Sequence, residues 1–114
     1  ITKQLEEGLS IMTHKDLNDK NDKKINFYYH LFSSLDVPNP SKNNWNIWKE
    51  NLTECDSHKL KDNNKICFID YQNNYGTRSS SLIAIPNNKK TNEKLIFKST
   101  NLFPCKNKYI DVVV

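Results

Sequence analysis

Residues 75–86 read YGTRSSSLIAIP, and this stretch indicates how the second half of the chain folds. Residues 82–85 form a short aliphatic run, which is typical of a buried β-strand. Ahead of this run stand Gly76, one of only two glycines, and Arg78, the one arginine beside sixteen lysines. A glycine that links two strands permits a positive φ or a close approach by another group. The stretch therefore predicts a strand that follows a tight and unusual link.

The residues on both sides of this stretch alternate with a period of two, which indicates further strands. The expected strands are 65–71, 82–85, 95–97 and 109–114. Turns rich in Asn connect them, and such short connections predict antiparallel neighbours. The strands are largely apolar on both faces, as in a sheet that is covered on both sides. We therefore expect a cover for the second face, either a preceding N-terminal segment or a partner chain.

Apolar residues at helical spacing predict helices over 1–12, 25–35 and 43–52. Asn21 or Asp22 can cap the second helix, and the prolines that follow it end it. The residues of the first apolar stripe are Ile1, Leu5, Leu9 and Met12. The third helix places both tryptophans of the chain on one face.

Together these elements predict an α+β fold, with helices packed on an antiparallel sheet. We expect residues 1–114 to form a single unit, mainly helical over 1–55 and in antiparallel strands over 65–114. Because one face of the sheet lacks a cover, we expect this unit to be the C-terminal half of a larger domain.

The charge of the chain narrows the choice of partners. The formal net charge is +4, but the lysines are scattered and no basic run is interleaved with aromatic residues. Such a pattern does not favour a nucleic-acid partner. No apolar stretch approaches the roughly 18 residues of a membrane-spanning helix, so we expect no transmembrane segment.

The cysteines are odd in number and widely spaced, at positions 55, 67 and 105. This pattern favours a reducing compartment over a disulfide framework, so we expect an intracellular protein, cytoplasmic or mitochondrial. Cys55 and His58 have a C-x-x-H spacing, but no second pair of ligands stands at zinc-finger spacing. Cys67 has the pattern of a small buried apolar residue, and Cys105 follows a proline in a loop. We therefore expect no metal site and no catalytic cysteine.

Haem ligation is a further chemistry that the side chains permit. His14, His30 and Met12 are residue types that can ligate haem iron. Met12 lies on the first apolar stripe, where a core role is more typical, and both histidines are more typical of surface positions. The cofactor is therefore unknown, with haem as a possible bound ligand.

Arg78 supports two interpretations. Its planar guanidinium offers a fork of donors that lysine does not provide. It can bridge a carboxylate such as that of Asp70, which would be a structural role, or it can contact a ligand. Both interpretations remain open from the sequence.

The motif 75–81 and the strand after it resemble the C-terminal signature of the Transport and Golgi organisation 2 family, also called the NRDE family. The resemblance extends over most of the chain, although it corresponds to only the later half of a typical family member. The residues that carry it, besides the motif, are 3–9, 35–40, 66–69, 82–85 and 95–97.

The resemblance implies the four-layer αββα sandwich of N-terminal-nucleophile hydrolases. It also implies that Arg78 and its neighbours line a cleft for a small anionic ligand. The ligand-binding residues expected on this ground are Tyr75, Gly76, Thr77, Arg78, Ser79 and Ser80. The family has been linked to haem mobilisation, to Golgi organisation and to lipid or acyl-CoA metabolism.

Three functions follow from this resemblance as hypotheses. The first is the handling or trafficking of haem or an acyl-CoA-like anion. The second is an amide or thioester hydrolase whose N-terminal cysteine nucleophile lies outside this chain. The third is a structural subunit of a larger assembly.

Overall fold

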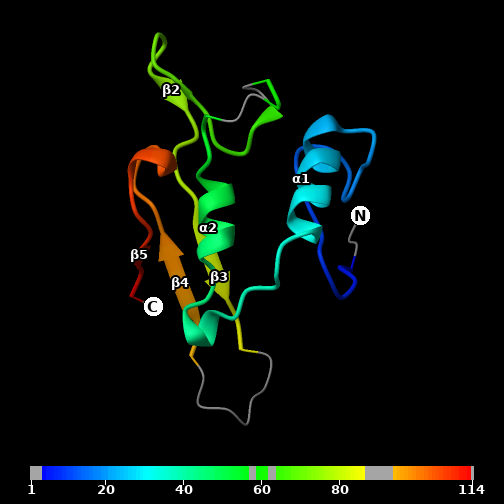
Figure 1. Cartoon of the computed structure of the whole chain (residues 1–114), viewed down its shortest axis with the longest axis vertical. Coiled ribbons are helices and arrows are strands. Elements are labelled where there is room, and N and C mark those ends of the chain that lie inside the picture. Colours follow the sequence, from blue (N-terminus) through cyan, green and yellow to red (C-terminus); the bar gives the residue numbers. More distant parts are fainter. Residues whose placement is uncertain (1–3, 57–58, 62–63, 87–93, 114) are drawn as a thin grey trace. The chain divides into compact units, whose positions relative to one another are not determined.

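The computed structural model describes residues 4–56, 59–61, 64–86 and 94–113 (Figure 1). The chain is an α+β protein of helices and two antiparallel sheets, as the sequence predicts. It divides into two compact units, Ile1–Val37 and Pro38–Val114, which we call unit 1 and unit 2.

Unit 1 is built on the helix α1 (Lys23–Ser33). The side chain of Asp22 caps this helix by accepting a hydrogen bond of 2.9 Å from the backbone N–H of Lys24. Ile25, Tyr28 and Phe32 are buried, and their spacing of three and four residues places them on one face. The predicted second helix and its cap at Asp22 are therefore confirmed.

The helix predicted over 1–12 is wrong for the described residues 4–12, which are irregular. Gly8 has a φ of 111°, which is incompatible with a right-handed helix. The Asn18 side chain accepts a hydrogen bond of 2.7 Å from the N–H of Ile11, and the Asn18 N–H donates to the Ile11 carbonyl. These bonds offer the backbone an alternative to helical pairing. Met12 is 70% exposed, so its expected place in the core is also wrong.

Unit 2 begins with two helical segments, η1 (Pro40–Lys42) and α2 (Asn46–Leu52). Trp45 occupies the N-cap position of α2 and is buried. The backbone N–H of Lys49 donates to the Trp45 carbonyl, which starts the helical hydrogen bonding. The short third helix is therefore confirmed, with its start at residue 46.

Two antiparallel sheets follow in unit 2. β1 (Ile69–Asp70) pairs with β2 (Tyr75–Gly76) as a hairpin. The second sheet has the order β3-β4-β5, with the strands β3 (Ser81–Ala84), β4 (Ile96–Ser99) and β5 (Ile110–Asp111). The short helix η3 (Pro104–Lys106) lies between β4 and β5 in the chain. The predicted antiparallel pairing is confirmed.

The single long strand predicted over 65–71 is wrong, because only residues 69–70 are in a strand. Residues 66–67 form a bend. The hydroxyl of Thr77 accepts from the Phe68 N–H and donates to the Ile66 carbonyl, so these backbone groups bond a side chain instead of a neighbouring strand. The strand expected over 109–114 is likewise limited to residues 110–111.

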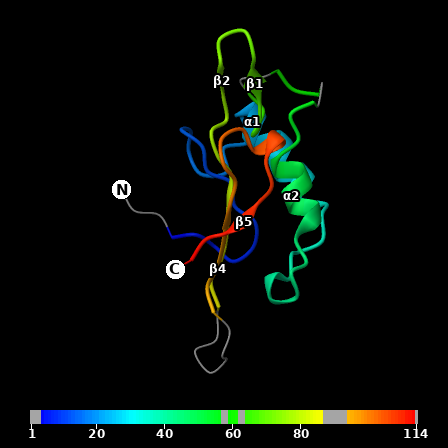
Figure 2. The same ribbon diagram turned by 90° about the vertical axis from the view of Figure 1, so that its left-hand side faces the viewer.

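The helix α2 lies along one face of the β3-β4-β5 sheet (Figures 1 and 2). Leu82 is buried with 6% of its surface exposed, whereas its neighbour Ile83 is 55% exposed and Ile110 is 54% exposed. Two large apolar side chains on the second face of this sheet are therefore open to solvent within the described part of unit 2. The segment or chain that we expect to cover it stays a prediction.

None of the helices in the described ranges has both the length and the apolar character needed to cross a membrane.

Candidate metal centre

The predicted ligand-binding residues 75–80 follow the chain from β2 to the start of β3. Tyr75, Arg78 and Ser79 are exposed, and the other three are half-buried. A cavity of about 620 Å³ in unit 2 lies elsewhere. Its lining residues are Asn39, Pro40, Ser41, Ala84, Ile85, Pro86, Lys94 and Ile96. The six predicted residues therefore do not line this cavity.

Arg78 makes no hydrogen bond or ion pair with another residue in the described part of the chain. The carboxylate of Asp70 instead accepts hydrogen bonds from the backbone N–H groups of Gln72 and Asn73 and from the Asn73 side chain. These bonds hold the pKa of Asp70 below its usual range. The proposed structural bridge between Arg78 and Asp70 is therefore not formed.

Gly76 and Thr77 bind the segment that precedes β1. A Cβ atom at Gly76 would lie 2.4 Å from the carbonyl oxygen of Phe68, so only glycine fits there without a shift of the backbone. The backbone N–H of Thr77 donates to this same Phe68 carbonyl at 2.9 Å. The Thr77 hydroxyl is 3.2 Å from the Phe68 nitrogen and 3.0 Å from the Ile66 carbonyl oxygen. The motif thus fixes the backbone on both sides of Cys67.

Ser80 joins the start of β3 to the C-terminal part of unit 2. Its hydroxyl lies 2.5 Å from the hydroxyl of Tyr109. Its backbone N–H donates to the Thr100 hydroxyl at 3.0 Å, and its carbonyl accepts from the Thr100 N–H at 2.9 Å. Burial raises the pKa of Tyr109, so this phenol is neutral and available for hydrogen bonding at neutral pH.

The fold brings the three cysteines of the chain together in unit 2. The sulfur atoms of Cys55, Cys67 and Cys105 all lie within 4.8 Å of one another. Cys67 is buried with 1% of its surface exposed, whereas Cys55 and Cys105 are half-buried. All three are free thiols. We call this group the thiol cluster.

Cys55 reaches the cluster from the C-terminal side of α2. The N–H and the hydroxyl of Thr53 both donate to the Lys49 carbonyl and so end the helix. The Cys55 carbonyl accepts a hydrogen bond of 3.2 Å from the side chain of Lys65, which is buried. The position of Cys55 thus depends on the end of α2 and on one buried lysine.

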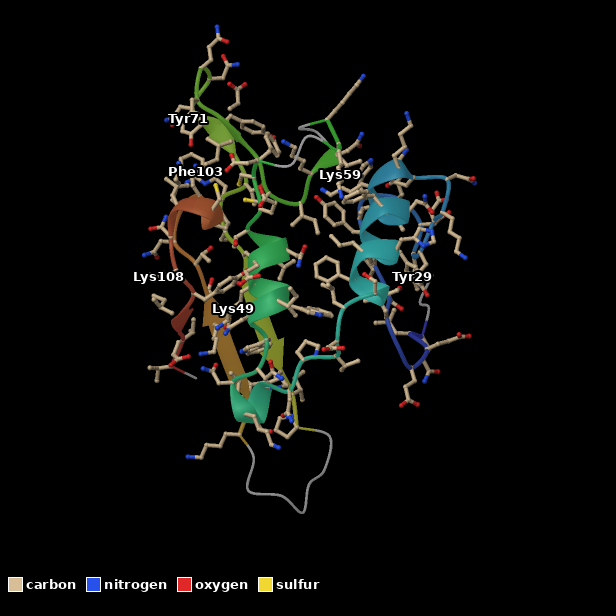
Figure 3. The ribbon with its side chains drawn as sticks, viewed as in Figure 1. Tyr29, Lys49, Lys59, Tyr71, Phe103 and Lys108 are labelled. Carbon is tan, nitrogen blue, oxygen red and sulfur yellow. The ribbon has the colours of Figure 1, made fainter. Side chains whose placement is uncertain are left out.

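Cys105 reaches the cluster from η3. Phe103 has a φ of 60°, and Pro104 after it is fully buried, so the chain turns sharply just before the cysteine. The ammonium of Lys106 lies 5.6 Å from the centre of the Tyr71 ring, within the range of a cation–π interaction. Figure 3 labels Tyr71 and Phe103, which lie at the same end of unit 2. This contact ties η3 to the hairpin that follows Cys67.

The electrostatics of the cluster do not favour a nucleophilic thiol. Burial, with the neighbouring thiols of Cys105 and Cys67, raises the pKa of Cys55 far above its usual range. Burial also raises the pKa of Cys67. Reactive cysteines require the opposite shift, which comes from a nearby cation or a helix N-terminus. Cys55 and Cys67 are therefore protonated at neutral pH in the absence of a metal ion.

The geometry of the cluster is close to that of a thiolate metal site. Two sulfur ligands of one tetrahedral zinc ion lie about 3.8 Å apart, because each Zn–S bond is about 2.3 Å long. The observed limit of 4.8 Å is within about 1 Å of that separation, which side-chain rotation can close. Across the described ranges, no His, Asp or Glu side chain joins the three cysteines in such a group. His58, singled out for its C-x-x-H spacing, lies outside the described residues.

Sequence reasoning missed this cluster because it looked for pairs of ligands at short spacing. The three cysteines are widely separated in the sequence, and only the tertiary structure brings their sulfur atoms together. One signal was available in the sequence, namely that all three cysteines of the chain lie between residues 55 and 105. His14 and His30, considered for haem, are both exposed in unit 1.

Comparison with known proteins gives no relative for this chain, since no family model, no curated protein and no solved structure matches it. The resemblance to the Transport and Golgi organisation 2 family therefore stays a prediction.

Proposed function

We propose that unit 2 binds one thiophilic metal ion through Cys55, Cys67 and Cys105. The observation that carries this proposal is the convergence of all three sulfur atoms within 4.8 Å. The three cysteines come from three separate segments, namely the chain after α2, the bend before β1 and η3. A metal ion on these ligands would cross-link the segments and stabilise the fold of unit 2.

A metal ion explains the cluster better than a disulfide or a nucleophile. A disulfide uses two sulfurs and leaves the third without a role. A nucleophile needs a lowered pKa, whereas burial raises the pKa of Cys55 and Cys67. A metal cation supplies the positive charge that ionises all three thiols, and the protons leave to solvent on binding.

The ligand set favours a soft d¹⁰ ion, Cu⁺ or Zn²⁺. Thiolate sulfur selects these ions over hard ions such as Mg²⁺ and Ca²⁺. Three thiolates complete a trigonal site for Cu⁺. They also leave a fourth position for water or another ligand on Zn²⁺. Because Cys55 and Cys105 are only half-buried, such a fourth ligand could come from solvent.

The test is a titration of the reduced chain with Cd²⁺, which reports thiolate ligation by an ultraviolet charge-transfer band. We expect saturation at one equivalent, and competition by Zn²⁺ or Cu⁺. Single Cys→Ser variants at 55, 67 and 105 should each lose most of the affinity, whereas His14→Ala and His30→Ala should bind as the wild type does. A wild-type chain without the band, or Cys variants that keep it, would contradict the proposal.

A second function, the handling of haem or an acyl-CoA-like anion, stays a proposal that the family resemblance motivates. The observation in its favour is that Arg78 is exposed and makes no hydrogen bond with another described residue, so its fork of donors is free for a carboxylate or phosphate. We expect haem or acyl-CoA binding to weaken about tenfold in Arg78→Lys, which keeps the charge but not the fork. Equal binding by both proteins would remove Arg78 from this function.

The same resemblance motivates the proposal that unit 2 is part of a four-layer αββα sandwich. The exposed side chains of Ile83 and Ile110 on one face of the β3-β4-β5 sheet support it, because a second sheet would cover them. A longer form of the protein should then protect the side chain of Ile83 from solvent, which methyl-detected NMR of that form can measure.

A further inference from the structure

We propose that Thr77 is a positioning residue that sets the metal affinity of the thiol cluster by fixing the backbone of Cys67. This inference rests on the metal-binding function proposed above. It gives the Tyr75–Ser80 segment a role in supporting the cluster, in addition to any contact that Arg78 makes.

One hydroxyl group controls both peptide groups that flank Cys67. The carbonyl of Ile66 belongs to the peptide group before Cys67, and it accepts from the Thr77 hydroxyl at 3.0 Å. The N–H of Phe68 belongs to the peptide group after Cys67, and it donates to the same hydroxyl at 3.2 Å. The hydroxyl is thus donor and acceptor at once, as a threonine side chain allows. These two bonds restrict the φ and ψ angles of Cys67, and hence the direction of its sulfur.

Regular secondary structure does not supply this restraint. Residues 66–67 form a bend, and β1 begins only at Ile69. The backbone bond from the Thr77 N–H to the Phe68 carbonyl at 2.9 Å brings Thr77 against this bend. Gly76 permits the approach, because a Cβ atom there would meet the Phe68 carbonyl oxygen at 2.4 Å. The side chain of Thr77 is half-buried, so water competes weakly with its bonds.

The consequence for the cluster follows from the burial of Cys67. Its sulfur is the most enclosed of the three, with 1% of the residue exposed, so it cannot be repositioned by moving out into solvent. Groups that orient a metal ligand typically account for about 10-fold to 100-fold in metal affinity. We expect an effect of that size when the Thr77 hydroxyl is removed.

The experiment compares Thr77→Val, Thr77→Ser and Thr100→Val in the full chain. Valine keeps the shape of threonine without the hydroxyl, and serine keeps the hydroxyl. Thr100 is a matched control, because its buried hydroxyl also accepts a backbone N–H bond, from Ser80, but does not flank a cysteine. Cd²⁺ and Zn²⁺ affinities are measured by competition with a chromogenic chelator, and stability is measured separately by denaturant unfolding of the metal-free protein.

We expect Thr77→Val to bind about 10-fold to 100-fold more weakly, Thr77→Ser to bind within a few-fold of the wild type, and Thr100→Val to lose stability without losing affinity. Thr77→Val should also weaken the Cd²⁺ charge-transfer band, because one thiolate is misaligned. Loss of stability in Thr77→Val with unchanged affinity and an unchanged band would overturn the inference. If Thr77→Val does not fold, Thr77→Ala takes its place with the same expected outcomes.

A second readout separates this inference from the proposed function. In the metal-free protein, a maleimide should label Cys67 faster in Thr77→Val than in the wild type, relative to Cys55 and Cys105. Faster labelling in a protein that binds no metal would overturn the proposed function and keep Thr77 as the group that positions Cys67. Metal binding with equal labelling and equal affinity in both proteins would overturn the role of Thr77 and keep the proposed function.

Discussion

At the scale of single residues, Gly76 illustrates why a chain with two glycines keeps one of them at the end of β2. The need is a close approach of backbones, since the Phe68 carbonyl oxygen occupies the space where a Cβ atom would stand. The other glycine, Gly8, has the opposite reason, a φ of 111° with open space around it. Two glycines thus serve the two distinct purposes that the residue has.

We expect Gly76→Ala to destabilise unit 2 by about 3 kcal/mol, because the added methyl group must displace the backbone of the segment that carries Cys67. Denaturant unfolding followed by tryptophan fluorescence measures this, since both tryptophans lie in unit 2. Ser79→Ala, an exposed position in the same segment, is the control and should change stability by less than about 0.5 kcal/mol. Equal effects of the two substitutions would show that Phe68 moves aside at little cost.

The helix cap of unit 1 gives a second prediction at this scale. Asp22→Ala removes the acceptor for the Lys24 N–H, and a cap of this kind contributes about 1 kcal/mol. Hydrogen exchange of the amides at the start of α1 should become faster in this variant. Asp16→Ala, at an exposed position before the helix, should leave these amides unchanged.

At the scale of elements, two adjacent residues of β3 lie on opposite faces of its sheet and differ greatly in exposure. Leu82 is 6% exposed on the face beneath α2, and Ile83 is 55% exposed on the other face. The register pairs Leu82 with Lys98 and Ile83 with Phe97, so the two faces extend across β4, where all four residues are half-buried. The sequence predicts a cover for this second face from a preceding segment or a partner chain, and that cover stays a prediction.

We therefore expect Leu82→Ala to cost about 3 kcal/mol of unfolding free energy, since it leaves a cavity under α2. Ile83→Ala should cost less than about 1 kcal/mol in this chain, because little buried surface is lost. Chemical denaturation of both variants checks the difference. A large cost for Ile83→Ala would mean that another segment or a second molecule covers this face in solution.

At the scale of the whole molecule, the thiol cluster makes the stability of unit 2 depend on pH. Burial raises the pKa of Cys55 and Cys67 in the folded, metal-free state, whereas an unfolded cysteine titrates near pH 8.5. The folded state therefore keeps protons that the unfolded state releases above that pH. The stability that these thiols contribute is fully present below about pH 8.5 and is lost as the pH rises further.

We expect the midpoint of urea unfolding of the metal-free protein to fall above about pH 8.5, and to fall less in Cys55→Ser. Metal affinity should change in the opposite direction and increase with pH, because binding releases protons from the thiols. Denaturation and Cd²⁺ titration over the same pH series check both signs. If stability and metal affinity both fell, or both rose, with increasing pH, this assignment of the protonation states would be contradicted.

Removal of the metal ion is a second prediction for the whole molecule. A ligand at 100 times its dissociation constant adds about 2.7 kcal/mol to stability, so a chelator should lower the melting temperature of unit 2. Unit 1 contains none of the three cysteines, and α1 should keep its hydrogen-exchange protection. Exchange measured by mass spectrometry, with the segment 66–68 compared against α1, tests this. Equal loss of protection in both units would contradict a local metal effect.

The sequence by itself determined the elements whose local signals agree with one another. In α1, the cap at Asp22 and the apolar spacing of Ile25, Tyr28 and Phe32 indicate the same helix, and the structure contains it. The aliphatic run 82–85 likewise corresponds to β3, which has the antiparallel neighbour β4. Local propensity and hydrophobic period depend on near neighbours in the chain, so they can be judged from the sequence.

Tertiary structure decided what depends on contacts between distant residues. The described residues 4–12 are irregular in spite of their helical pattern, and Asn18 bonds the backbone of Ile11 there. The strand pattern over 65–71 is interrupted where the hydroxyl of Thr77 bonds the backbone on both sides of Cys67. The motif at 75–80 stood out in the sequence, but its contact with the backbone around Cys67 became visible only in the fold. The thiol cluster is the clearest case, because three cysteines that are far apart in the chain become neighbours only when the segments between them close.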